Sequence, residues 1–187
     1  EKIHMSGWIK KIEKQFFPAS RYQPDTTSED FQIIDAAQLH VLGSKIRVGD
    51  FYRSLKECLF GANAAIGKIH CTLKEQQCFL LHPSIVSAGL SCAMSYGPFK
   101  VSEQYDIGED GFLPYKIDKL IVKHPLQEED YFCYVECVKI EEDSVLLYFE
   151  ILDQNYDPVV IFENIRLQRV SDQALFKSLI DEKTTAS

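Results

Sequence analysis

A segment without Asp, Glu, Lys or Arg, CFLLHPSIVSAGLSCAMSYG, runs from Cys78 to Gly97 and sets the strongest demand on how this chain folds. Pro83 suits the first turn of a helix, where its missing N–H is not needed, and Gly97-Pro98 is expected to end the helix. Because a helix that is apolar around most of its surface must be covered, the rest of the chain has to wrap around it.

That covering is predicted to be an antiparallel sheet. Two strands, FYRSLKECLFG and AAIGKIHCTL, meet around residues 61–63, and a short helix closed by Gly43 is expected before them. Segments rich in β-branched and aromatic residues follow the apolar helix, and the last two are expected to form a hairpin over residues 153–158. These segments are FLPYKIDKLIVK, YFCYVECVKIE, SVLLYFEILD and VVIFENIRLQRV. The sequence therefore predicts an α+β fold.

The 187 residues are enough for one domain with tails. Residues 1–30 are predicted to form a helix that Pro18 ends, followed by a polar linker, and residues 31–172 to form the domain. Residues 173–187 read as a tail. The helical stripe consists of Ile3, Trp8, Ile9, Ile12 and Phe16. Since the chain has no plausible initiator Met, we expect it to be a fragment of a longer protein.

The net charge of −8 argues against nucleic-acid binding, which needs a concentrated basic surface. No apolar window is long enough to predict a membrane span, and the N-terminus lacks a signal-peptide core. The six cysteines are interpreted as buried reduced thiols, and the expected compartment is the cytoplasm. His70, Cys71, Cys78 and His82 do not have zinc-site spacing, so no metal site is expected.

Serines recur at helical spacing in the apolar segment: Ser84, Ser87, Ser91 and Ser95. Side chains three or four residues apart lie over one another, so the serines are predicted to share one side of the helix. Two interpretations remain open. The hydroxyls can bond back to carbonyls and allow close packing, or the stripe can line a cavity that holds a ligand.

LLHPSIVSAGLS resembles the HPALLDAALQ helix of polyketide synthase dehydratase domains, which opens the C-terminal half of their double hotdog. Three further segments match the family in the same order along the chain. The segment containing the family's YGPAFRGL is similar to GDFYRSLKECLFGANAAIGKI. The family strand LPVGIERLRVH is similar to GFLPYKIDKLIVKHPL, and the closing hairpin DLRLYDEDGRVVLRIEGLRLRRL is similar to ILDQNYDPVVIFENIRLQRV. The resemblance covers about residues 31–172 and implies a single hotdog, a long apolar helix wrapped by a twisted antiparallel sheet.

The chain departs from the dehydratase pattern at the residues that carry the chemistry. Ser87 stands at the position of the family's acidic Asp, and Ser91 at that of the Gln or His four residues later. His82 is kept, whereas Val48 replaces the Tyr of YGPAF and Tyr52 its Phe. The family's HxxxGxxxxP motif is absent from the printed sequence. Dehydration needs a base and an acid, and a serine hydroxyl does not supply the acid near neutral pH.

The resemblance therefore implies a non-dehydrating hotdog domain of a modular polyketide synthase, a scaffold or binding element for acyl chains tethered to an acyl carrier protein. The alternative is a branching or cyclising enzyme that acts on the same carrier-bound thioester, and the fallback is a thioester-binding module outside polyketide biosynthesis. No residue is assigned a catalytic role. The expected substrate-binding residues are Tyr52, His82, Ser87 and Ser91.

Partners follow from the same resemblance. The substrate is expected on a phosphopantetheine arm, with no permanently bound cofactor. Lys116, Lys119 and Lys123 are candidates for a basic patch that docks the carrier protein, or are simply solvated strand lysines. A single hotdog leaves a sheet edge and a helix face to cover, so we expect a homodimer or pairing with a second hotdog, together with neighbouring megasynthase domains.

Overall fold

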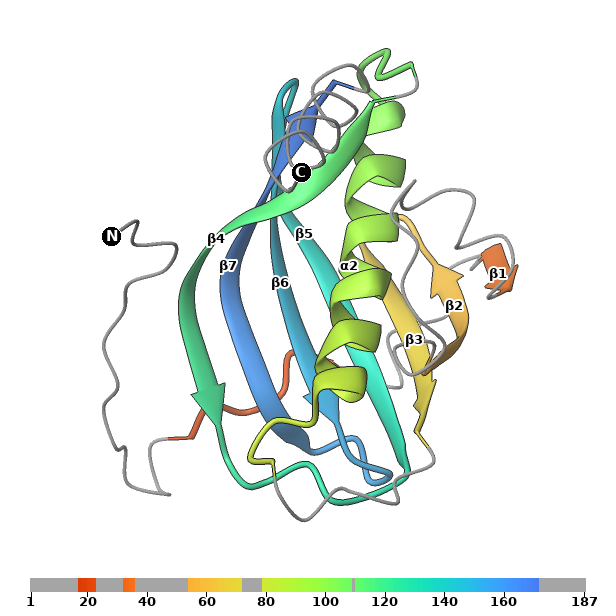
Figure 1. Cartoon of the computed structure of the whole chain (residues 1–187). Helices are drawn as coiled ribbons and strands as arrows, with labels where there is room; N and C mark the ends of the chain where they lie inside the picture. Colours follow the sequence, from red (N-terminus) through yellow and green to blue (C-terminus); the bar gives the residue numbers. More distant parts are fainter. Residues whose placement is uncertain (1–16, 23–31, 36–53, 72–78, 109, 172–187) are drawn as a thin grey trace, which may run out of the picture.

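The computed structural model describes residues 17–22, 32–35, 54–71, 79–108 and 110–171. These residues form a seven-stranded antiparallel sheet that curls around one long helix, α2 (Pro83–Ser102) (Figure 1). The strands lie in the order β1-β2-β3-β5-β6-β7-β4. Their bounds are β1 (Gln32–Asp35), β2 (Leu55–Phe60), β3 (Ala64–His70), β4 (Gly111–Val122), β5 (Asp130–Glu141), β6 (Ser144–Leu152) and β7 (Pro158–Val170).

The predicted α+β architecture is confirmed, with the long apolar helix wrapped by the sheet as the sequence requires. The predicted β2–β3 hairpin and the four strands after the helix are present, and β6 and β7 pair across the expected connection. The segment 17–22 has no regular secondary structure. The predicted N-terminal helix and the C-terminal tail lie outside the described residues.

The helix predicted before Gly43 is wrong at its start, because residues 32–35 are strand β1. Ile33 pairs with Leu59 of β2, so the backbone of β1 finds its partners in the neighbouring strand. The periodicity of a short apolar run cannot distinguish a helix from a strand. Here the segment is a strand because the edge of β2 is available for pairing. The remainder of that predicted helix lies outside the described residues.

The predicted end of the apolar helix is also wrong, because α2 continues through Pro98 to Ser102. An interior proline removes one backbone hydrogen bond and costs about 3 kcal/mol. The last turns offset this cost through burial: Tyr96 and Val101 are fully buried, and the Tyr96 hydroxyl donates to the Gly61 carbonyl at 3.1 Å. Each buried side chain of this size contributes about 1.5–3 kcal/mol, so tertiary packing keeps the helix going.

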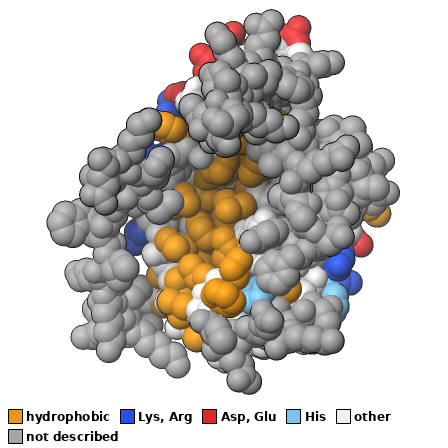
Figure 2. Space-filling view, viewed as in Figure 1, with side chains coloured by type: hydrophobic (Ala, Val, Ile, Leu, Met, Phe, Trp, Pro, Cys, Tyr) orange, Lys and Arg blue, Asp and Glu red, His pale blue; other side chains and the backbone are white. Residues whose placement is uncertain are grey.

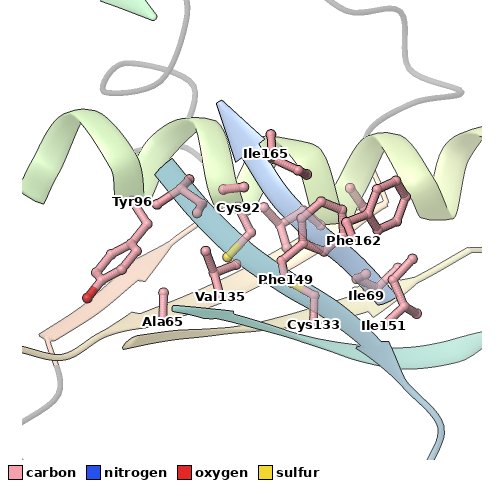
Figure 3. Close-up of a cluster of buried hydrophobic side chains, with 14 of the residues drawn as sticks. Ala65, Ile69, Cys92, Tyr96, Cys133, Val135, Phe149, Ile151, Phe162 and Ile165 are labelled. Carbon is pink, nitrogen blue, oxygen red and sulfur yellow. The ribbon is translucent and has the colours of Figure 1, made fainter. Parts of the chain in front are cut away.

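The main core lies between α2 and the concave face of the sheet (Figure 3). Two helix glycines allow this close approach: a Cβ at Gly97 would lie 2.9 Å from Val145, and one at Gly89 would lie 3.0 Å from the Phe149 ring. Phe149 stacks on Phe162 of the neighbouring strand, with ring centroids 4.1 Å apart. The helix is therefore held against β6 and β7 at near-contact distance.

Three free thiols meet at the centre of this core, from β2, α2 and β5. The sulfur atoms of Cys58 and Cys92 are 3.2 Å apart, and Cys133 is the other neighbour of Cys92. Hydrogen bonding with Cys133 and Cys58, together with burial, raises the pKa of the Cys92 thiol. The Cys92 thiol therefore stays protonated, and the three buried side chains pack as small apolar groups. Cys78 lies outside the described residues.

The convex face of the sheet carries a buried carboxylate, Glu150 of β6. Its Oε1 accepts hydrogen bonds from the Ser20 hydroxyl at 2.6 Å and from the backbone N–H groups of Arg21 and Tyr22, each at 3.0 Å. Its Oε2 accepts from the Tyr148 hydroxyl at 3.0 Å. A buried carboxylate needs such donors, and here they tie the segment 17–22 across the sheet.

The same segment covers the convex face with side chains. Phe17 packs on a small cluster that contains Tyr148, and the guanidinium of Arg21 lies 3.9 Å from the centre of the Tyr148 ring. Arg21 also pairs with Glu136 at 3.2 Å. Burial, followed by the charge of Glu150, raises the pKa of the Tyr148 hydroxyl, which therefore remains a donor. Residues 17–22 are thus an integral part of the sheet's outer layer.

Replacing the Glu150 carboxylate should weaken the fold. Glu150→Gln places an amide N–H₂ opposite groups that are themselves donors, so we expect a loss of about 2–3 kcal/mol in the free energy of unfolding. Urea unfolding followed by circular dichroism measures the change. Glu136→Gln is the control, since its ion pair with Arg21 is partly exposed and should contribute under about 1 kcal/mol. Equal effects of the two variants would contradict this role of Glu150.

Candidate functional site

The candidate site follows α2, whose sides have different environments. Ile85, Ala88 and Cys92 face the sheet and are fully buried. The serines occupy a second side, about a quarter-turn or more away, as the helical spacing predicts. A third side is apolar and only partly buried; it carries Val86, Leu90 and Met94.

The two interpretations of the serines, close packing and contact with a ligand, apply to different members of the stripe. The Ser91 hydroxyl donates to the Ser87 carbonyl, and the Ser95 hydroxyl to the Ser91 carbonyl, each at 2.8 Å. Ser84 and Ser95 are buried, which fits close packing, whereas Ser87 and Ser91 are partly exposed. Within the described part of the chain, the Ser87 hydroxyl has no hydrogen-bond partner. Ser87 and Ser91 are therefore the serines that a ligand can reach.

His82 immediately precedes the helix, and its side chain is only 1% exposed. Its carbonyl accepts hydrogen bonds from Ile85 and Val86, each at 3.1 Å, so its backbone rather than its imidazole caps the helix. The imidazole meets the Phe79 ring edge-on, with centroids 5.7 Å apart, and its Nδ1 lies 3.9 Å from the Cys71 sulfur. Burial lowers the pKa of His82, so the neutral ring is favoured.

An apolar strip runs along the helix side of the sheet, as Figure 2 shows. The sheet contributes Ile117 and Leu120 of β4, which are 40% and 43% exposed. They pair with Ile165 and Phe162 of β7, both part of the main core, so their side chains share the concave face. Because β4 ends the sheet, this strip continues to an edge strand. Apolar surface of this kind suits an acyl chain or a second apolar surface.

Among the described residues, no buried carboxylate lies beside α2, where dehydration would need one. Helix α2 contains no Asp or Glu. Among the described residues, Glu150 is the one buried carboxylate, and it lies on the convex face. The imidazole of His70 pairs with Asp130 at 2.7 Å, but His70 alternates with the buried Ile69 and Cys71 and so also faces away from the helix. No described carboxylate is buried beside α2 to serve as a proton donor.

Two of the three lysines proposed for carrier docking are paired with acidic side chains. Lys116 pairs with Asp118 at 2.7 Å, and Lys119 with Glu163 at 3.2 Å. Lys123 lies 5.6 Å from the centre of the Phe17 ring. Lys116 and Lys119 are therefore locally neutralised, which does not favour the docking role.

Tyr52, the remaining predicted site residue, lies outside the described residues, so its place relative to His82 and the serines stays a prediction. No group of three metal-binding side chains occurs among the residues that the structure describes. Within the same residues, no helix is long and apolar enough to span a membrane.

Sequence reasoning missed Glu150 and did not predict the contact between Cys71 and His82. A signal for Glu150 exists, because it is the one carboxylate within the otherwise apolar strand SVLLYFEIL. The Cys71–His82 contact had no such signal, since the two residues are brought together only by the sheet and helix ends that meet there.

The structure is similar to solved dehydratase domains of polyketide synthases. The dehydratase domain from the CurJ module of the curacin polyketide synthase matches with a TM-score of 0.68 and 18% identity, over 82% of this chain and 54% of that one. The dehydratase domain of RzxB from Pseudomonas fluorescens gives 0.65 and 15%, over 81% and 54%. A trans-acyltransferase polyketide synthase enoyl-isomerase gives 0.59 and 15%, over 81% and 57%.

This likeness confirms the predicted resemblance at the level of the fold: the chain has the hotdog fold of these dehydratase domains. The chain spans about half the length of the solved domains that it matches. No family model matches the sequence, and no curated protein sequence matches it significantly.

Burial of His82 predicts a pH-dependent stability. In the folded chain the pKa of His82 lies below its unfolded value of about 6.5. Unfolding therefore takes up a proton at His82 as the pH falls below that value. Stability should be complete above about pH 6.5 and decline toward the lower, folded pKa. Urea midpoints between neutral and mildly acidic pH measure the decline. His82→Gln should reduce the dependence of the urea midpoint on pH, whereas the same change at the exposed His124 should not. An equal pH dependence for the wild type and His82→Gln would contradict this role of His82.

Proposed function

We propose that this chain is one half of a dehydratase-like domain of a polyketide synthase, and that it binds carrier-tethered acyl chains without dehydrating them. The observation that supports this most directly is the composition of α2, which holds Ser87 at the position matched to the family's acid and contains no carboxylate. The hotdog fold supports the polyketide synthase setting.

The chemistry argues against elimination. A β-hydroxyacyl thioester loses water when a base removes the α-proton and an acid protonates the departing hydroxyl. The neutral imidazole of His82 is a base, but Ser87 cannot act as the acid near neutral pH. The described residues offer no buried carboxylate on this side of the sheet to replace it.

The site nevertheless suits an acyl chain. Val86, Leu90 and Met94 form the apolar side of α2, and the partly exposed Ser87 and Ser91 adjoin it. Apolar walls with a few hydroxyls are typical of sites for small apolar ligands. We propose that His82 and Tyr52 complete the site and that a phosphopantetheine arm presents the thioester.

A second candidate is an enzyme that rearranges the bound chain, by branching, cyclisation or double-bond migration. The specific support is that a solved enoyl-isomerase of a polyketide synthase has the same fold. A base alone suffices to start such reactions, because no hydroxyl has to leave. His82, buried and held neutral, is the described residue suited to that role.

The edge strand β4 supports pairing with a second hotdog. Tyr115 is 76% exposed, and Ile117 and Leu120 expose apolar surface along the same strand. Long, partly apolar edge strands invite another strand, since their outer N–H and C=O groups lack sheet partners. Because the chain spans about half of the dehydratase domains it matches, we propose that a second copy or another hotdog pairs here.

The binding function is tested with an acyl carrier protein charged with a β-hydroxyhexanoyl chain. The full chain should bind it with the acyl mass unchanged. Loss of one water from the acyl group would overturn the non-dehydrating proposal. Unchanged mass with a new connectivity, detected by fragmentation, would favour the rearranging enzyme.

A matched pair of variants locates the binding site. Ser91→Phe should fill the site and weaken binding of the charged carrier about tenfold or more, because an added ring displaces the acyl chain. Ser102→Phe, at the exposed far end of the same helix, should leave binding unchanged. Equal affinities for both variants, with both folded, would show that the chain binds elsewhere.

Pairing is tested by sedimentation equilibrium. Wild-type chain should self-associate, and the double change Ile117→Lys with Leu120→Lys should give monomers, since two charges would be buried in the contact. Val138→Lys, on the central strand β5 and 45% exposed, is the control and should still associate. A wild-type chain that stays monomeric at high concentration would contradict pairing with a second copy and leave another hotdog as the partner.

A further inference from the structure

Cys71 and His82 are brought together where three parts of the chain converge. Cys71 follows β3 and donates its N–H to Glu129 at 2.8 Å, and Leu126 donates to Leu80 at 3.2 Å. The segments before α2 and before β5 are therefore tied to the end of β3. This arrangement sets the Cys71 sulfur 3.9 Å from Nδ1 of His82, a contact between residues eleven positions apart.

Cys71 differs from the other described thiols. Cys58, Cys92 and Cys133 are completely buried and have one another as neighbours, whereas Cys71 is 6% exposed and contacts an imidazole. Cys137 is more exposed, but no contact with a histidine is described for it. A cysteine becomes a nucleophile when a neighbouring group takes its proton. Of the described thiols, Cys71 has that neighbour.

The geometry provides a route for proton transfer from the thiol to the imidazole. Burial keeps His82 in the neutral form, which can accept a proton at Nδ1 when the other ring nitrogen carries the hydrogen. The N···S distance of 3.9 Å is long, as catalytic contacts often are before a substrate binds.

We propose that Cys71, with His82 as its base, accepts an acyl group from a thioester. The Cys71 thiol gives its proton to Nδ1 of His82, and the thiolate attacks the thioester carbonyl carbon. The bond from that carbon to the substrate sulfur then breaks, and the departing thiolate takes the proton back from His82. One thioester is exchanged for another, so no oxidant or further reactant is needed.

The apolar residues around His82 indicate which class of acyl group the site would accept. Phe79 and Leu80, which are 43% and 59% exposed, precede His82, and Leu81 packs on the core beside it. An apolar acyl chain is therefore favoured over a charged one. The inference rests on the proposed function only for the choice of a thioester as substrate, and it adds a covalent step to that binding role.

The experiment uses the full chain and hexanoyl-N-acetylcysteamine, a thioester that needs no carrier protein. Acid quenching and peptide mass mapping should find one hexanoyl group on Cys71. Cys71→Ala should abolish this adduct, and Cys137→Ser, the matched control at a thiol without a described imidazole, should not. His82→Gln should slow acylation roughly a hundredfold, in line with the loss of a general base.

A second measurement does not depend on whether the buried variants fold. In the wild-type chain, Cys71 should be acylated about tenfold or more faster than Cys137, and urea should remove this preference by separating the pair. No adduct on Cys71, no preference over Cys137, or an unchanged rate in folded His82→Gln would each overturn the proposal. If Cys71 stays unmodified while the charged carrier still binds, the acylation step is wrong and the binding function stands. If Cys71 is acylated but the charged carrier does not bind, the binding function is wrong and the acylation step stands.

Discussion

Burial of α2 against the sheet is the constraint on which the rest of the structure depends. The helix has almost no charged surface, so most of its circumference must be removed from water. Gly89 and Gly97 let it approach β6 and β7 to near-contact distance, and this packing carries the helix through Pro98. The sheet is curled because it has to follow the helix, and the helix persists because the sheet covers it.

The same packing decides which helix residues remain available for chemistry. Ser87, Ser91 and the apolar side of α2 are left partly open once the inner face is buried. The fold places His82 at the start of the helix, beside Cys71 and out of water. Helix α2 carries no carboxylate, and the described residues beside it offer a binding surface and a base but no buried acid. For that reason we propose binding, rearrangement and acyl transfer rather than dehydration.

Much of the fold could be predicted because strand pattern, turn residues and the apolar helix agree with one another. The predictions were wrong where local signals were weaker than tertiary contacts: β1 is a strand because β2 offers it an edge, and α2 passes Pro98 because Tyr96 and Val101 are buried. The serine stripe was predicted correctly, since helical spacing alone sets it. The partner of His82 was not, because no local pattern relates it to Cys71.

The sequence by itself determined that a long apolar helix must be wrapped by an antiparallel sheet and that this helix carries a stripe of serines, Ser87 among them. It could do so because residue identity and spacing along one helix are local properties. Only the tertiary structure decided that Glu150 holds residues 17–22 across the convex face and that Cys71 meets His82. Both contacts join segments separated along the chain, so they exist only after the strands have found their register.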